Sequence, residues 1–141
     1  MTKQEAKEYM QQIAEKYSAP TKTLKISAFN YWAYVENVVD GDTLDLRIDL
    51  GFKISVRERF RLLGVDTPEK YGVKKDSEEH ARGVVASAFT ENAIPDDRWV
   101  EVEVYNGKKG KYGRWLCQVF VNGESLNEML LSSGNAKPLP L

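Results

Sequence analysis

The sequence predicts an α+β fold that is mainly β: a five-stranded β-barrel with two packed helices and an extra N-terminal helix. The length of 141 residues suits one domain. The 42% hydrophobic and 29% charged residues are typical of a folded, soluble chain and exclude a disordered one. Apolar residues that alternate with polar ones predict the strands, and apolar residues at helical spacing predict the helices.

Residues 1–17 are predicted to form an amphipathic helix. Its apolar side chains recur at helical spacing and form a narrow stripe on one face: Ala6, Met10, Ile13 and Tyr17. Pro20 is expected to end this helix, because the residue before a proline disfavours helical backbone. We therefore expect an appendage over residues 1–20, which docks on the domain or on a partner, followed by one barrel domain over residues 21–141.

The first three strands follow from residue type and alternation. Residues 28–39 are rich in aromatic and β-branched side chains, and residues 44–48 alternate apolar with charged ones. After a turn that ends at Gly51, the alternation resumes at Phe52. The third strand is predicted to run from there through Leu62, with a bend near Arg57.

A polar loop then leads into the second helix. Asp76 or Ser77 is predicted to cap it, with Glu79 completing a capping box, and Pro95 marks its end. Its apolar residues are expected to face the core: Val84, Val85, Ala88 and Phe89.

The last third of the chain predicts two more strands and a helix. Residues 100–104 and 114–121 carry strand patterns, and Asn122-Gly123 is a strong hairpin turn. Ser125 and Glu128 form a capping box for the final helix, Gly134 ends that helix, and residues 135–141 are expected to be irregular. Five strands with a helix after the third and after the fifth are typical of an OB-fold-type barrel, a fold that does not by itself decide function.

Composition excludes several classes of protein. Cys117 is the single cysteine, which excludes an internal disulfide and a multi-cysteine zinc site, and it is expected to pack in the core. No apolar run approaches the roughly 20 residues that span a membrane. A net charge of −1 and a pI near 5.9 argue against a protein that coats nucleic acid. The N-terminal residues lack a signal-peptide pattern, so we expect a cytoplasmic protein, or a secreted one if an upstream signal was removed.

Asp40-Gly41-Asp42-Thr43 lies directly before a predicted strand. Carboxylates two residues apart around a glycine can converge on a hard cation, which prefers oxygen ligands. Considered alone, this short pattern is better explained as a solvated turn.

The second polar block spans residues 60–69. Here Arg61 lies on one face of a strand that leads to Asp66, the Thr67 carbonyl and Glu69, with Pro68 fixing the turn. This concentration of polar groups after an apolar run is unusual and indicates a functional site. The alternative is a charged strand end followed by an ordinary proline turn.

The third block, residues 106–115, is basic. It has four positive charges and no acid: Lys108, Lys109, Lys111 and Arg114. Tyr112 can stack on a base, and Gly113 lets the backbone approach a ligand. An exposed hairpin loop is the alternative for this block.

In this order, the three blocks resemble the staphylococcal nuclease (thermonuclease) family, and the resemblance covers residues 35–137. The segments that carry it include VVDGDTLDL (residues 38–46), FRLLGVDTPE (residues 60–69) and KYGRWL (residues 111–116). The resemblance implies a nuclease on an OB-fold barrel that uses Ca²⁺ (calcium) to hydrolyse phosphodiester bonds. The implied substrates are DNA and RNA, with single-stranded or frayed segments favoured, and the implied products carry 3′-phosphate ends.

The resemblance also implies a role for each acidic residue of the first two blocks. Asp42, Asp66 and the Thr67 backbone carbonyl correspond to the calcium ligands, and Asp40 lies behind them without binding the ion directly. Glu69 corresponds to the general base that activates water.

The basic residues correspond to groups that hold the substrate. Arg61 and Arg114 match the two arginines that grip the scissile phosphate, a role that suits the planar guanidinium fork. Lys111 and Tyr112 match residues around the terminal phosphate and sugar of the nucleotide.

This chain also departs from the family pattern. The hairpin before Arg61 is longer, and the loop between Glu69 and Ala86 differs, so its geometry cannot be carried over. His80 has no counterpart in the family site and is expected to face solvent or to cap the helix. The tryptophans are expected to pack in the core or at the barrel rim: Trp32, Trp99 and Trp115.

Two functions besides a nuclease stay open. One is a non-catalytic module that binds nucleic acid on its OB-fold barrel, and the other is a structural or protein-interaction module. The presence of every matching acid and arginine favours the nuclease. We expect a monomer that does not bind membranes.

Overall fold

The computed structural model describes residues 1–17, 29–109 and 114–139. In chain order the elements are α1 (Lys3–Tyr17), β1 (Phe29–Asp40), β2 (Thr43–Asp49), β3 (Ser55–Leu62), β4 (Val65–Asp66), α2 (Glu78–Ala93), β5 (Trp99–Lys109), β6 (Trp115–Val121), β7 (Glu124–Ser125), α3 (Leu126–Ser132) and β8 (Lys137–Pro138). None of the helices in these described ranges is long and apolar enough to cross a membrane.

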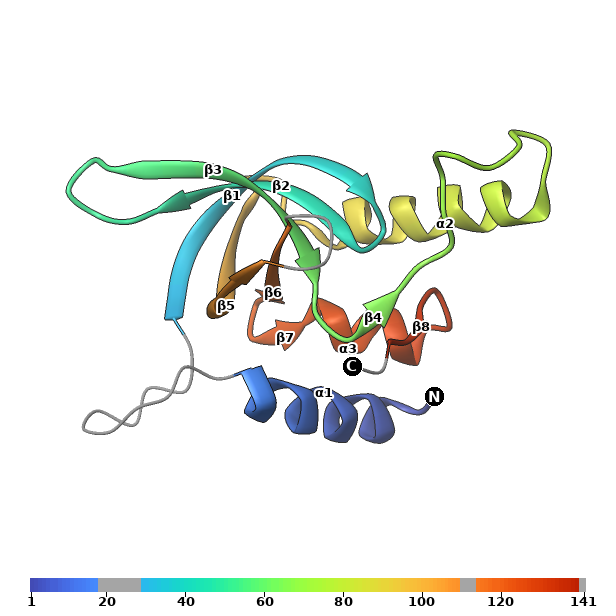
Figure 1. Cartoon of the computed structure of the whole chain (residues 1–141), viewed down its shortest axis with the longest axis horizontal. Helices are drawn as coiled ribbons and strands as arrows, with labels where there is room; N and C mark the ends of the chain where they lie inside the picture. The colour runs from blue at the N-terminus through green and yellow to red at the C-terminus, as the bar shows by residue number, and fades with distance from the viewer. Residues whose placement is uncertain (18–28, 110–113, 140–141) are drawn as a thin grey trace.

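Five strands close into a mixed barrel, as the sequence predicts (Figure 1). Antiparallel pairing gives the order β3-β2-β1-β5-β6, and β7 pairs antiparallel with the end of β6. The end of β3 then pairs in parallel with the start of β6, which joins the two edges of the sheet. With three helices around this barrel, the fold is α+β.

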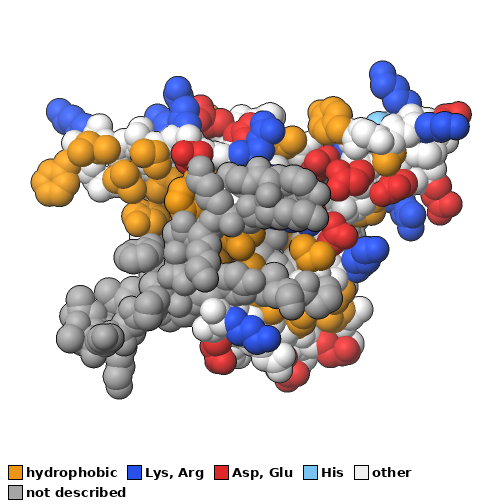
Figure 2. All heavy atoms as spheres, viewed as in Figure 1, with side chains coloured by type: hydrophobic (Ala, Val, Ile, Leu, Met, Phe, Trp, Pro, Cys, Tyr) orange, Lys and Arg blue, Asp and Glu red, His pale blue; other side chains and the backbone are white. Residues whose placement is uncertain are grey.

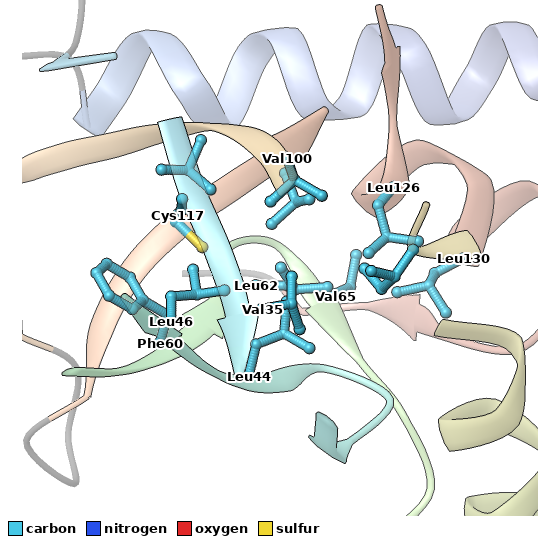
Figure 3. Packing of buried hydrophobic residues seen from close by; sticks show 14 of the residues in the cluster. Val35, Leu44, Leu46, Phe60, Leu62, Val65, Val100, Cys117, Leu126 and Leu130 are labelled. Atoms are coloured by element: carbon cyan, nitrogen blue, oxygen red, sulfur yellow. The ribbon is translucent and has the colours of Figure 1, made fainter. Parts of the chain in front are cut away.

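The barrel core forms because alternate residues of each strand point inward. Along β2, for example, Leu44, Leu46 and Ile48 are buried while Asp45 and Arg47 are partly exposed. Figure 3 shows side chains from several strands and from α3 meeting in one cluster. Each such buried side chain contributes roughly 1.5–3 kcal/mol, so this cluster holds the strand ends that carry the site.

Both terminal helices pack onto the barrel. The N-terminal stripe of α1 is buried at Ala6, Met10 and Ile13, and α1 lies against α3 (Figure 1). Within α3, Leu126 and Leu130 enter the core (Figure 3). The predicted amphipathic helix therefore docks on the domain itself.

A buried asparagine in α3 ties the end of the barrel together. Asn127 Nδ2 donates to the carbonyls of Leu63 (2.9 Å) and Cys117 (3.3 Å), and Asn127 Oδ1 accepts from the Val119 N–H (3.2 Å). Ser125 is confirmed as the N-cap of this helix, because its hydroxyl accepts from the Glu128 N–H. Cys117 is buried, as expected, and burial raises the pKa of its thiol.

The prediction that the third strand begins at Phe52 is wrong. Residues 51–54 form the turn of the β2–β3 hairpin, closed by a hydrogen bond from the Leu50 N–H to the Ile54 carbonyl (2.9 Å). Phe52 is 97% exposed, and hydrophobic side chains gather at this hairpin tip (Figure 2). The expected bend at Arg57 is also absent from β3, because β3 pairs with β2 without a register shift.

The predicted inward face of α2 is wrong for Val84, Val85 and Ala88, whereas Phe89 is partly buried and packs against the core as predicted. Val85 is 60% exposed and Val84 is also exposed. The buried face consists of small residues: Gly83, Ala86, Ser87 and Thr90. The physical reason is that this face packs against the backbone of the turns that carry the site, where large side chains have no room.

Two local predictions near the helix ends also change. Ser77 alone caps α2, accepting from the His80 N–H at 3.1 Å, so the expected pair of Asp76 and Glu79 does not form the capping box. The tail is not entirely irregular, because Lys137 in β8 pairs with Asp66 in β4.

Candidate active site

The acidic blocks predicted from the sequence meet at one end of the barrel. The turn between β1 and β2 carries Asp40 and Asp42, and β2 pairs with β3 so that Thr43 lies opposite Arg61. Two residues after β3, β4 delivers Asp66 to the same end, and the chain continues to Glu69. Acidic side chains gather on this face where the β1–β2 turn meets α2 (Figure 2).

Asp42 is the most buried of these acids, at 3% exposed. One carboxylate oxygen, Oδ1, accepts from the Thr43 hydroxyl at 2.9 Å, and the other, Oδ2, accepts from the Thr67 N–H at 3.1 Å. The Asp42 carbonyl accepts from the Leu62 N–H at 2.8 Å. The Thr67 N–H therefore holds the Asp42 carboxylate, and the Leu62 N–H of β3 holds the Asp42 backbone, so both parts of the residue are fixed.

Arg61 joins the two carboxylates that were predicted as metal ligands. Its Nη2 lies 3.1 Å from Asp42 Oδ2 and 3.2 Å from Asp66 Oδ1, and it donates to the Val65 carbonyl at 3.3 Å. The side chain is only 15% exposed, so these ion pairs are much less screened than surface ones. Both carboxylates therefore converge on one point next to a guanidinium group.

Charge and burial shift the pKa values of the two remaining acids. Burial raises the pKa of Glu69, and the negative charges of Asp40 and Asp42 raise it further, against the opposing charge of Arg61. Burial also raises the pKa of Asp40, with a further contribution from Asp42. These carboxylates are therefore close enough for their negative charges to repel one another.

Arg114 reaches the same region from the start of β6. Its positive charge opposes the rise in the pKa of Asp40, as does that of Lys70, so both cations lie near this carboxylate. Lys111 and Tyr112, the other predicted substrate contacts, lie outside the described residues. The structure therefore brings Arg114 toward the predicted acids from a distant part of the sequence.

Helix α2 packs against the β1–β2 turn that carries Asp40 and Asp42. The Thr90 hydroxyl donates to the Gly41 carbonyl at 2.7 Å, between the two acids of the β1–β2 turn. A Cβ on Gly41 would lie 2.9 Å from Thr67 Cγ2 and 3.0 Å from Ala86 Cβ, so only glycine fits there. The sequence interpretation missed this supporting face, although its run of small residues was the available signal.

A cavity of about 490 Å³ lies beside the carboxylates, between the Asp66–Glu69 turn, α2 and the segment before β8. Asp66, Thr67 and Glu69 line it, whereas Asp40, Asp42 and Arg61 do not. Asp66 and Glu69 therefore border the cavity, and the Asp66–Glu69 turn lies between the cavity and the other two acids, Asp40 and Asp42.

The donor atoms fit a hard divalent cation. Asp42 and Asp66 converge on Arg61, and the Thr67 backbone lies next to Asp42. The Thr67 hydroxyl oxygen is buried and has no hydrogen-bond partner. Asp40 Oδ1 is likewise buried without a partner. Within the described ranges, no three His, Cys, Asp or Glu side chains meet as a metal cluster, but the predicted set has two carboxylates and a backbone carbonyl.

Comparison with known proteins points to one family. The family model for the staphylococcal nuclease homologue matches residues 59–139. The chain is 38% identical over 103 residues to the thermonuclease of Staphylococcus intermedius, a match that covers 73% of this chain and 56% of that protein. It is 34% identical over 121 residues to the thermonuclease of Staphylococcus hyicus, covering 85% and 67% of the two chains. It is also 32% identical over 110 residues to endonuclease YhcR of Bacillus subtilis, covering 75% of this chain and 9% of that protein.

Proposed function

This chain belongs to the staphylococcal nuclease family, and we propose that it is a calcium-dependent nuclease that hydrolyses phosphodiester bonds of DNA and RNA. The observation that carries the proposal is the convergence of Asp42 and Asp66 on Arg61, with Glu69 on the adjoining turn. Phosphodiester hydrolysis requires groups of these three kinds. The carboxylates of Asp42 and Asp66 can hold a cation, Glu69 can act as the base, and Arg61 can stabilise the charge of the phosphate.

In this proposal Asp42, Asp66 and the Thr67 carbonyl hold Ca²⁺, and Asp40 adds negative charge behind them. When bound, the ion supplies charge neutralisation for a phosphate and a lower pKa for coordinated water. The all-oxygen donor set favours calcium over softer metals.

The residues of the chain carry out the remaining steps. Glu69 accepts a proton from the attacking water, for which it must lie within hydrogen-bond reach of that water. Arg61 and Arg114 donate to the phosphate oxygens, where negative charge increases in the transition state. The water oxygen bonds to phosphorus as the bond from phosphorus to the 5′ oxygen breaks. One product keeps a 3′-phosphate, and the other leaves as a 5′-hydroxyl that takes up a proton from solvent.

The substrate is expected to be single-stranded or frayed. The near-zero net charge of the protein provides no broad attraction for a duplex, so binding depends on the local basic residues and on the cation. Lys111 and Tyr112 are the proposed contacts for the terminal phosphate and sugar. The active species is proposed to be a monomer, because each proposed catalytic residue comes from the same chain.

The test is a cleavage assay on single-stranded DNA, duplex DNA and RNA, with calcium or with a chelator. Glu69→Gln keeps the size of the side chain and removes the base, so the rate is expected to fall at least about 100-fold. Glu58→Gln is the matched control, because Glu58 is exposed on β3 away from the site. Cleavage that persists in chelator or in Glu69→Gln would contradict the proposal, and binding without cleavage in any divalent metal would favour the non-catalytic module.

A further inference from the structure

The first turns of α2 contact the peptide group that follows the proposed base. A Cβ on Gly83 would lie 2.5 Å from the Glu69 carbonyl oxygen, 2.7 Å from its carbonyl carbon and 2.9 Å from the Lys70 nitrogen. Such distances are too short for any side chain, and the atoms concerned are backbone that cannot rotate away. Glycine is also a poor residue for a helix interior, so its position here is explained by this contact.

His80 holds the same segment from one turn earlier in the helix. Its Nδ1 lies 2.9 Å from the Lys70 carbonyl oxygen. Because a carbonyl oxygen can only accept, Nδ1 carries the proton and donates it to this bond. The His80 backbone N–H is itself fixed by the Ser77 cap, so the ring is anchored to the start of the helix.

A third contact comes from the β1–β2 turn. The Lys70 backbone forms a hydrogen bond with the Asp40 carboxylate. The Glu69–Lys70 peptide therefore lies between the acidic β1–β2 turn and α2, with Gly83 closing the gap and His80 holding the carbonyl that follows. These contacts fix the backbone from which the Glu69 side chain extends.

We propose that Gly83 and His80 are positioning residues that place the carboxylate of Glu69 for proton abstraction. The inference rests on the proposed function of Glu69, and neither residue needs to touch the substrate. A displacement of roughly 1 Å at a reacting group can cost about 100-fold in rate. A side chain at position 83 forces a shift of that order in the Glu69 backbone or in α2.

The first experiment is steady-state kinetics of Gly83→Ala with a single-stranded oligonucleotide in saturating calcium. We expect kcat to fall at least about tenfold while KM changes by less than about twofold, because the base moves and the phosphate contacts stay. Val84→Ala is the matched control, since Val84 is the next helical residue and is exposed. A kcat within about twofold of wild type would overturn the proposal.

A double-mutant cycle separates positioning from a general structural role. If Gly83 acts through Glu69, adding Gly83→Ala to Glu69→Gln changes the residual rate by less than about twofold. If the two losses multiply, Gly83 acts independently of the base and the proposal is wrong.

The second variant, His80→Ala, covers the case in which Gly83→Ala fails to fold. We expect faster amide hydrogen exchange in a peptide spanning residues 68–72, together with a lower kcat at an unchanged KM. Unchanged exchange and unchanged kcat would overturn the role of His80. Hydrogen exchange does not need catalysis, so it tests the His80 contact even if the wild-type protein does not cleave. A wild-type protein that does not cleave would count against the proposed function and not against this contact.

Discussion

At the scale of single residues, Arg61 has two partners that also define the candidate metal position. The guanidinium group contacts Asp42 and Asp66 through one nitrogen, which leaves other N–H groups of the same fork to face a phosphate. In the proposed mechanism an arginine suits this position, because its planar fork can bond carboxylates and a phosphate together. A lysine ammonium is a point charge and lacks the fork geometry.

We therefore predict that Arg61→Lys lowers kcat/KM by about 100-fold or more, since both the phosphate contact and the carboxylate bridge weaken. Initial cleavage rates would measure this loss, with circular dichroism to verify folding. Arg59→Lys is the control, because Arg59 pairs with Asp45 on an exposed part of the same strand. Full turnover by Arg61→Lys would remove this residue from the mechanism.

At the scale of elements, α2 acts as a support for two turns of the site. Its buried face consists of small residues, and the Thr90 hydroxyl donates to the Gly41 carbonyl between Asp40 and Asp42. The apolar pattern of the helix suggested the opposite face, because Val84 and Val85 are hydrophobic and were expected to be buried. Hydrophobic periodicity predicts which face is buried only when the partner surface is an apolar core. Here the partner surface is backbone, to which small residues come closest.

Thr90→Val is predicted to destabilise the protein by about 1–3 kcal/mol, because it leaves the buried Gly41 carbonyl without its donor. Denaturant unfolding would measure the change in the free energy of unfolding. Thr90→Ser keeps the hydroxyl and is expected to retain more of the stability than Thr90→Val. A larger loss in Thr90→Ser than in Thr90→Val would show that the methyl packing, and not the hydrogen bond, matters.

At the scale of the whole molecule, barrel closure brings the candidate site together. The parallel pairing of β3 with β6 sets Arg61 opposite Leu116, close to the point where Arg114 enters the barrel. The turn before β2 and the turn after β4 then meet at the same end. The near-zero net charge of the chain is thus compatible with a local concentration of acids next to arginines.

Calcium is predicted to raise the melting temperature of the protein, because an ion that binds only the folded state stabilises it by mass action. At a free concentration 100 times the dissociation constant, the gain is about 2.7 kcal/mol. Asp66→Asn is expected to remove most of this gain, whereas Asp96→Asn, on the exposed turn after α2, keeps it. A calcium effect of equal size in Asp66→Asn and in wild type would contradict the assigned ligand.

The sequence by itself determined the features that depend on near neighbours. Alternation along β2, the Ser125 cap of α3 and the turn before β7 each involve residues a few positions apart, and each was predicted correctly. The order of the acidic and basic blocks likewise indicated the family. Only the tertiary structure decided which face of α2 is buried, that Arg61 bridges Asp42 and Asp66, and that Gly83 contacts the backbone of Glu69. Those contacts join segments that barrel closure and helix packing bring together, so no local pattern contains them.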